Sequence, residues 1–396
     1  MLARLVRLGH RYNAVVTLTR ERALDEARRA DADLAAGRDH GPLHGIPYGV
    51  KDLIATSGIA TTWGAEPYRD QVFAEDAEVI RRLGVAGAVL AAKLSMVELA
   101  GGMGYNCADA SFNGPGLNPW NTKYWSGGSS SGPGAAVAAA LVPFAIGSET
   151  SGSILTPASF CGVTGLRPTY GLVSRRGAMA LSWTLDKLGP MARSAEDCGL
   201  VLSAIAGKDA GDPSSVEAGF EWNGPPDPRL VRRRQWRIAV PKGVTEKAQK
   251  EVARNFERAL AALGDSAVIT RDVEWPDFPW GPAVGTIVGA EGASAFLDLI
   301  ESGGLSKLRC ERDRWAGYGG TAVSAVDYLQ AMRLRGPMKD AVNGLFERYD
   351  AIAAPTRPSV AYPADLEFQK AWPGVSGGPA LIPAGNLCGL PAICLP

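Results

Sequence analysis

Helical and strand-like patterns of apolar residues alternate along the first half of the chain. Residues 19–36 carry Ala and Leu among alternating charges, and Gly37 follows, which predicts an amphipathic helix that stops at a glycine. Short apolar runs bounded by Gly and Pro predict buried strands, one of which leads directly into Lys51. The strand that leads into Lys51 covers 46–50. The other expected elements are a helix over 75–84, a strand over 88–92, a helix from Pro133 through 135–141 and a strand over 144–147.

The second half continues the alternation, with strands expected over 237–241, 267–273 and 351–354 and helices over 246–263 and 323–335. Such alternation predicts an α/β fold with a central mixed sheet flanked by helices. We interpret residues 1–396 as a single large domain. Its expected parts are a catalytic core over 35–210, a Pro-, Gly- and Arg-rich surface linker over 211–236, and a second half over 237–396 that completes the sheet and the substrate cleft.

Composition narrows the class of protein. The 396 residues are 46% hydrophobic and 21% charged, and the 41 basic residues equal the 41 acidic residues. This balance gives no excess of positive charge that would indicate binding to nucleic acid or to an anionic membrane. The longest apolar stretch, 135–146, contains a proline and is shorter than the roughly 20 residues that span a bilayer. The N-terminal residues lack the apolar region of a signal peptide, so a soluble, cytoplasmic protein is expected.

The six cysteines form no C-x-x-C pair, and no histidine lies near any of them. This spacing argues against a zinc site and against a disulfide framework. We therefore expect buried free thiols, no metal and no cofactor.

The three histidines, His10, His40 and His44, all lie near the start of the chain. The match of residues 128–132 to the G-x-S-x-G nucleophile elbow is therefore spurious, because that fold places its histidine after the serine. A serine hydrolase without histidine needs another base, and a lysine serves if it is neutral. The candidate is Lys51. Taken by itself, Lys51 fits an ordinary surface ion pair with Asp52 or Glu98 better than the role of a base.

Residues 101–132 form a long segment rich in Gly, Asn, Ser and Trp, which is typical of a functional loop. Two turns rich in Gly and Ser, at 126–134 and 147–153, border short apolar elements. Small residues with exposed backbone N–H groups make anion-binding sites, so the amides leading to Ser153 could face one oxyanion.

These turns carry long, ordered motifs, and the chain closely resembles the amidase signature family. The main motifs are Gly127-Gly128-Ser129-Ser130, Gly147-Ser148-Glu149-Thr150-Ser151-Gly152-Ser153-Ile154, Pro157-Ala158-Ser159-Phe160-Cys161-Gly162 and Gly165-Leu166-Arg167-Pro168-Thr169. Supporting segments are Gly45-Ile46-Pro47, Val50-Lys51-Asp52, Leu188-Gly189-Pro190-Met191-Ala192-Arg193 and 386–391. The resemblance covers most of residues 13–210 and, more weakly, 325–396.

The resemblance implies a Ser-cisSer-Lys amidohydrolase. Ser153 would be the acylated nucleophile. Ser129 would be the relay serine that follows a cis peptide bond, and neutral Lys51 would be the base. The amides of Thr150, Ser151, Gly152 and Ser153 would hold the oxyanion, while Met103, just before the relay loop, could line the substrate pocket.

Four positions depart from the family pattern. The family usually has Asp at the position of Glu149, Gly at Ser131 and Ser151, and Arg at Leu155. The change at Leu155 removes a guanidinium beside the nucleophile and suggests more apolar surroundings. Relatives also begin with more helix and continue further, so the chain resembles a form shortened at both ends.

The resemblance implies hydrolysis of a small aliphatic or aryl amide through an acyl-enzyme, with aryl carbamates and esters as further substrates of the same chemistry. One alternative is a protein like the subunit of a glutamine amidotransferase that works with partners. The other is an inactive shortened member that acts as a binding protein. The expected partner is a small-molecule amide rather than nucleic acid or membrane, and a homodimer is left open.

Overall fold

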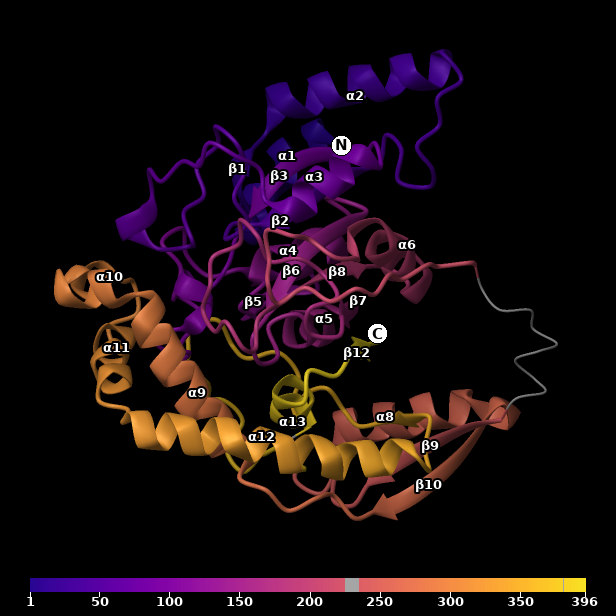
Figure 1. The fold of residues 1–396 in the computed structure, drawn as a ribbon, viewed down its shortest axis with the longest axis vertical. Coiled ribbons are helices and arrows are strands. Elements are labelled where there is room, and N and C mark those ends of the chain that lie inside the picture. The colour runs from indigo at the N-terminus through magenta and orange to yellow at the C-terminus, as the bar shows by residue number, and fades with distance from the viewer. Residues whose placement is uncertain (225–234, 380) are drawn as a thin grey trace.

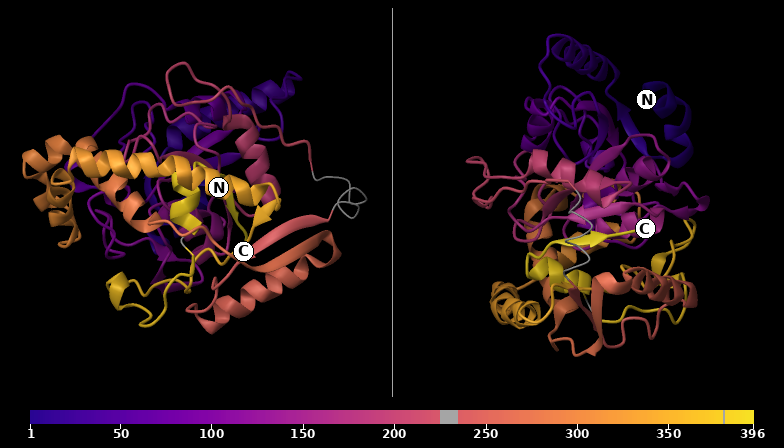
Figure 2. Two further views of the ribbon diagram at one scale, coloured as in Figure 1. Left: turned by 60° about the horizontal axis from the view of Figure 1, so that its bottom comes forward. Right: turned by 90° about the vertical axis from the view of Figure 1, so that its right-hand side faces the viewer.

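The computed structural model describes residues 1–224, 235–379 and 381–396. Figure 1 shows a larger N-terminal body, in indigo and magenta, above a smaller body in orange, and the right-hand view of Figure 2 shows the same division. The yellow C-terminal segment runs between the two bodies. No helix in the described ranges is long and apolar enough to cross a membrane.

A seven-stranded mixed sheet forms the centre of the larger body, in the order β1-β3-β2-β6-β8-β7-β12. The pairs β3–β2 and β2–β6 are parallel, and the other neighbours are antiparallel. The strands are β1 (Val15–Leu18), β2 (Pro47–Lys51), β3 (Val89–Leu94), β6 (Phe144–Glu149), β7 (Thr164–Arg167), β8 (Lys187–Ala192) and β12 (Ala392–Cys394). The strand order thus places segments that lie about 100 residues apart in the sequence on neighbouring strands.

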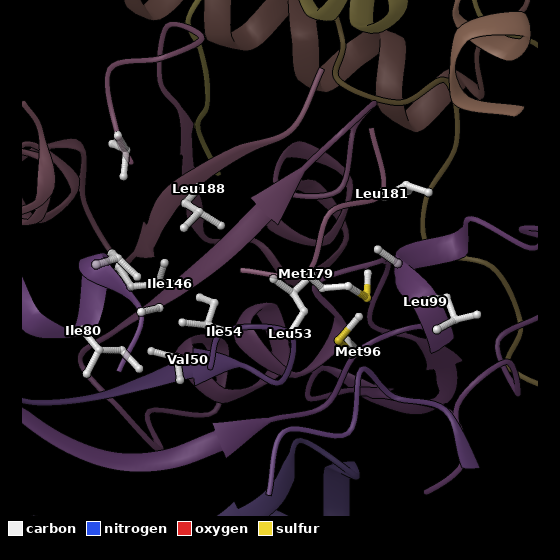
Figure 3. Packing of buried hydrophobic residues seen from close by; sticks show 14 of the residues in the cluster. Val50, Leu53, Ile54, Ile80, Met96, Leu99, Ile146, Met179, Leu181 and Leu188 are labelled. Carbon is white, nitrogen blue, oxygen red and sulfur yellow. The ribbon is translucent and has the colours of Figure 1, made fainter. Parts of the chain in front are cut away.

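Both faces of this sheet are covered, because alternate side chains of the strands are apolar on each side. On one face α4 and α5 pack against residues such as Ala145 and Met191. On the other face α3 and α6 pack against Val50, Ile146 and Leu188, which Figure 3 shows as part of one continuous core. The helices of this body are α1 (Leu2–Leu8), α2 (Arg20–Ala35), α3 (Glu78–Val85), α4 (Ser131–Ala138), α5 (Leu155–Cys161) and α6 (Ala195–Ile205).

The smaller body has its own three-stranded parallel sheet, in the order β10-β9-β11. Its strands are β9 (Trp236–Pro241), β10 (Ala267–Val273) and β11 (Ala351–Ile352). Its helices are α8 (Lys250–Ala262), α9 (Trp280–Ala295), α10 (Leu297–Glu301), α11 (Asp313–Thr321) and α12 (Ala325–Phe346). The chain then returns through α13 (Leu381–Leu387) to add β12 to the main sheet.

The predicted α/β class with a central mixed sheet is confirmed. Most expected elements also lie where the sequence placed them, but four details differ. The long segment 101–132 contains a hairpin, β4 (Leu117–Asn118) with β5 (Asn121–Trp125). The helix after it begins at Ser131 rather than at Pro133. The expected helix over 323–335 extends through Pro337, and the expected strand over 351–354 is only two residues long.

The prediction that 237–396 completes the main sheet is correct only for β12, since β9, β10 and β11 pair with one another instead. The predicted surface linker over 211–236 is also only partly exposed. Asp212 and Ser215 are buried, and Asp212 accepts hydrogen bonds from the backbone amides of Arg175 and Ser214. Residues 225–234 of that prediction lie outside the described residues.

The expectation that all cysteines are free thiols is wrong for one pair. Cys107 and Cys310 form a disulfide across 203 residues of sequence, with their Cα atoms 6.8 Å apart. Only the tertiary structure brings these two together, so spacing could not reveal the bond. The remaining cysteines, Cys161, Cys198, Cys388 and Cys394, are buried free thiols as expected.

Candidate active site

Lys51 ends β2 and is fully buried. Its Nζ donates to Ser129 Oγ at 2.7 Å and to Ser148 Oγ at 2.9 Å. Both partners are hydroxyl groups, and no carboxylate of the described residues forms an ion pair with Lys51. The structure therefore joins two of the three sequence-predicted catalytic residues by a hydrogen bond.

The surface ion pair that was the alternative for Lys51 does not form. Asp52 instead forms an ion pair with Lys93 at 3.1 Å, and both side chains are fully buried. The Glu98 carboxylate accepts from the backbone amides of Arg309 and Cys310. Both candidate carboxylates are thus committed to other groups.

Burial lowers the pKa of Lys51 to about 7, and the carboxylates of Asp186 and Glu149 partly oppose that shift. An ordinary lysine has a pKa near roughly 10.4 and stays protonated at neutral pH. A lysine with a pKa near neutrality has a substantial unprotonated fraction, so it can accept a proton.

Ser129 is held by the loop before α4. The peptide bond Gly128–Ser129 is cis, as the resemblance implies. The Ser129 carbonyl accepts from the amide of Val97 at 3.0 Å, and the next residue, Ser130, donates its amide to the carbonyl of Ser153 at 3.3 Å. The last contact brings the loop of Ser129 against the turn of Ser153.

Ser153 lies in the turn that connects β6 to α5. Gly152 precedes it with φ +95°, a left-handed conformation that favours glycine. Among the described residues, the amides of Thr150, Ser151, Gly152 and Ser153 donate no hydrogen bond, and neither does the Ser153 hydroxyl. Unpaired amides in one tight turn are the arrangement that binds an anion.

The Glu149 side chain holds this turn by hydrogen bonds, a role that the sequence did not predict. Its carboxylate accepts from the amides of Ile154 and Leu155 at 2.9 and 3.1 Å. It also accepts from Arg167 at 2.8 Å and from Asn386 at 3.0 Å. Although burial opposes it, the Arg167 charge and these hydrogen bonds lower the pKa of Glu149 to about 2. The turn therefore has a guanidinium nearby, that of Arg167, although Leu155 stands where the family usually has an arginine.

Ser148, Asp186 and Lys187 were also missed by sequence reasoning. Asp186 Oδ1 accepts from Thr150 Oγ1 at 2.6 Å and so braces the same turn. Lys187 begins β8 and faces Glu149 in the strand register. The only sequence signal was their place next to a motif strand, which a single sequence does not distinguish from ordinary core.

A cavity of about 210 Å³ reaches this site. Its lining includes Ser148 and Thr150 from the candidate site, the apolar side chains of Leu53, Leu181 and Trp183, and charged side chains such as Arg175. Met103, predicted to line the substrate pocket, instead lies in the core at 1% exposure and is not among the residues that line this cavity.

The described residues also bring Asp33, His40 and His44 together, with potential ligand atoms within 4.8 Å of one another. The Asp33 carboxylate already binds Arg38, and its other oxygen lies 3.1 Å from His40 Nε2. These contacts account for the cluster without a metal ion, and the absence of a metal site remains a prediction.

The fold and this constellation define a class of α/β protein with a buried lysine, a serine on a cis peptide and a second serine in a turn of unpaired amides. The family model described as Amidase matches residues 1–396, so the chain belongs to the amidase family, the amidase signature enzymes that act on amides. The chain is 38% identical to a subunit of glutamyl-tRNA(Gln) amidotransferase from Methylococcus capsulatus, over 100% of this chain and 85% of that protein.

Two solved structures are similar in fold and sequence. A structure described as a vestigial protein complex that reveals the evolutionary origins of an s-triazine catabolic enzyme has a TM-score of 0.88 at 32% identity, covering 99% of this chain and 85% of the other. Native peptide amidase from Stenotrophomonas maltophilia has a TM-score of 0.84 at 32% identity, covering 100% and 85%.

Proposed function

We propose that the chain hydrolyses a carboxylic amide through an acyl-enzyme on Ser153, with Ser129 as relay and Lys51 as base. The observation that carries the proposal is the fully buried contact of Lys51 Nζ with Ser129 Oγ at 2.7 Å. The pKa of this lysine lies near 7, and its hydrogen-bond partners are hydroxyl groups rather than a carboxylate. It can therefore exchange a proton with them.

In this mechanism Ser153 Oγ attacks the amide carbonyl. Its proton passes to Ser129 Oγ while the proton of Ser129 passes to neutral Lys51. The free amides of Thr150 to Ser153 bind the oxyanion, and each such donor contributes typically about 3 to 4 kcal/mol. The relay then runs in reverse and protonates the leaving nitrogen as the C–N bond breaks. Water hydrolyses the acyl-enzyme by the same route.

The cavity that ends at Ser148 and Thr150 supports a small substrate with an apolar group. Its lining includes aliphatic side chains such as Leu53 and Leu181, and Trp183, at 45% exposure, lies where an aromatic ring could stack. It also includes the charged side chains Arg175, Arg176, Asp186 and Asp212. Small aliphatic or aryl amides fit this lining, and aryl carbamates and esters would use the same acylation step.

Labelling with a fluorophosphonate probe tests the proposal without a known substrate. The intact chain should acquire one phosphonyl group on Ser153, located by mass spectrometry, and Ser153→Ala should remain unlabelled while folded. The control is Ser203→Ala, in α6, which should label as the parent does. A phosphonyl group on Ser130, or none on any serine, contradicts the assignment and in the second case favours an inactive binding protein.

A second candidate function is that of an amidotransferase component that works with partners. The observation in its favour is that curated relatives from several bacteria, 34–38% identical over 91–100% of this chain, are all named as the same subunit of glutamyl-tRNA(Gln) amidotransferase. Both candidates use the same Lys51–Ser129–Ser153 chemistry and differ in amide donor and partners.

Ammonia release separates the two candidates. A stand-alone amidase should release ammonia from simple amides without any added protein, and glutamine should be a poor substrate. An amidotransferase component should copurify with partner proteins from its native source and should release ammonia from glutamine only in their presence.

A further inference from the structure

Lys187 is the second buried lysine near the candidate site. It is 2% exposed, and its Nζ has no hydrogen-bond partner among the described residues. Burying an ammonium group without a partner is strongly unfavourable, so burial favours the neutral amine and lowers the pKa of Lys187 to about 7.

The strand register explains which groups Lys187 meets. Lys187 on β8 lies directly opposite Glu149 on β6, and side chains at such positions share one face with Cβ atoms about 5 Å apart. Asp186 is its neighbour in sequence. On β6, Ser148 precedes Glu149 and bonds Lys51, while Thr150 follows and bonds Asp186.

The same two carboxylates, Glu149 and Asp186, act electrostatically on both buried lysines. Burial is the largest cause that lowers the pKa of both Lys51 and Lys187 to about 7, and the same two carboxylates oppose that shift in each case. Other groups also face Lys187. After burial, the positive charge of Arg167 on β7 is the largest cause that lowers the pKa of Lys187. The charge of Arg335 on α12 lowers this pKa further.

We propose that Lys187 is a positioning residue that acts through Glu149 and Asp186, drawing on their negative charge so that Lys51 stays unprotonated at neutral pH. This rests on the proposed role of Lys51 as the base. When Lys187 is protonated, its positive charge offsets part of the negative charge of Glu149 and Asp186. These carboxylates then stabilise the protonated form of Lys51 less. The two lysines then titrate as a coupled pair.

The sign of the effect distinguishes this role from a purely structural one. Lys187→Met removes the competing cation, so the carboxylates hold the proton on Lys51 more strongly. The acid limb of the reaction should move upward by roughly 0.5 to 1 pH unit. Lys187→Arg carries a permanent charge and should move the same limb downward. A loss of packing alone would lower the rate at every pH without opposite shifts.

The experiment measures the second-order rate of fluorophosphonate labelling at Ser153 from pH 5 to 10, in the full chain. The variants are Lys187→Met, Lys187→Arg and Lys51→Arg, with Lys93→Met as the matched control, because Lys93 is a buried lysine on a neighbouring strand. Each variant is assayed well below its melting temperature, so that only folded protein contributes.

The expected result is a parental limb near pH 7 that is unchanged in Lys93→Met, absent in Lys51→Arg and shifted in opposite directions by the two Lys187 variants. If the limb belongs to Lys51 but both Lys187 variants keep the parental midpoint, the role of Lys187 is overturned while the base assignment stands. If Lys51→Arg keeps the parental limb, the base assignment itself fails, and the role of Lys187 fails with it.

Discussion

Lys51 and Lys93 are two buried lysines on neighbouring parallel strands, and they face opposite sides of the sheet. The register pairs Val50 with Lys93 and Lys51 with Leu94. Lys93 meets Asp52, the carbonyl of Ile54 and the hydroxyl of Thr61. Within the described part of the chain, the hydrogen bonds of Lys51 Nζ go to two hydroxyl groups, those of Ser129 and Ser148.

The difference shows that burial alone does not make a lysine a base. Lys93 is neutralised by a carboxylate in direct contact, which fixes both charges as a structural pair. Lys51 is surrounded by neutral donors and acceptors, with carboxylates at a distance, so its proton is exchangeable. One residue of offset along a strand reverses the side chain's direction and, with it, the chemistry.

The largest effect should separate the two lysines by activity. Lys51→Arg should lower kcat/KM by about 10³- to 10⁴-fold, because a guanidinium stays charged and cannot accept the proton. Lys93→Met should keep most activity per folded molecule. The measurement is amide hydrolysis normalised to folded protein. Near-parental activity in Lys51→Arg would show that Lys51, like Lys93, is not the catalytic base.

Stability should separate the lysines in the opposite direction. Lys93→Met should lower the free energy of unfolding by about 3 to 5 kcal/mol, because it leaves Asp52 buried without its partner. Lys51→Met should not destabilise the fold, since a neutral side chain replaces one whose charging is opposed by burial. Urea unfolding at pH 7 measures both.

The double variant Asp52→Leu with Lys93→Met serves as the control for that loss. Removing both charges together should restore much of the stability that Lys93→Met loses. A double variant as unstable as the single one would show that packing, rather than the unpaired carboxylate, causes the effect.

Ser129→Ala should lower kcat/KM by about 10²-fold, with acylation continuing slowly through a water between Lys51 and Ser153. The rate of fluorophosphonate labelling should fall in parallel. Unchanged labelling would remove Ser129 from the relay and leave its contact with Lys51 as a structural one.

The pH dependence should identify Lys51 as the titrating group. Because burial lowers its pKa to about 7, kcat/KM should rise about tenfold per pH unit below pH 7 and level off above it, as the neutral amine becomes the dominant form. A profile that rises only near pH 10 would mean that Lys51 has an ordinary pKa, like an exposed lysine.

The smallest effect is expected from Ser148→Ala, about three- to tenfold in kcat/KM, because Lys51 keeps its bond to Ser129 and loses one hydrogen bond worth about 1 kcal/mol. Ser203→Ala provides the matched control. A loss as large as that of Ser129→Ala would place Ser148 in the proton relay.

The sequence by itself predicted the α/β alternation and most strand and helix positions, and it singled out Lys51, Ser129 and Ser153 as the candidate catalytic residues. These features depend on local patterns, such as apolar periodicity, glycine at a left-handed turn and ordered motifs over a few residues. The motif at 147–154 also located the turn of free amides, because Gly152 and small neighbours determine that turn locally.

The tertiary structure alone decided which lysine pairs with a carboxylate. Both lysines lie at the end of buried apolar runs in the sequence, and the partners of each come from loops and strands far along the chain. The same holds for Glu149 against Arg167 and Lys187, and for Cys107 with Cys310. Such contacts are set by strand order and register, which bring distant segments together only when the whole sheet is formed. Short-range sequence patterns do not specify that order.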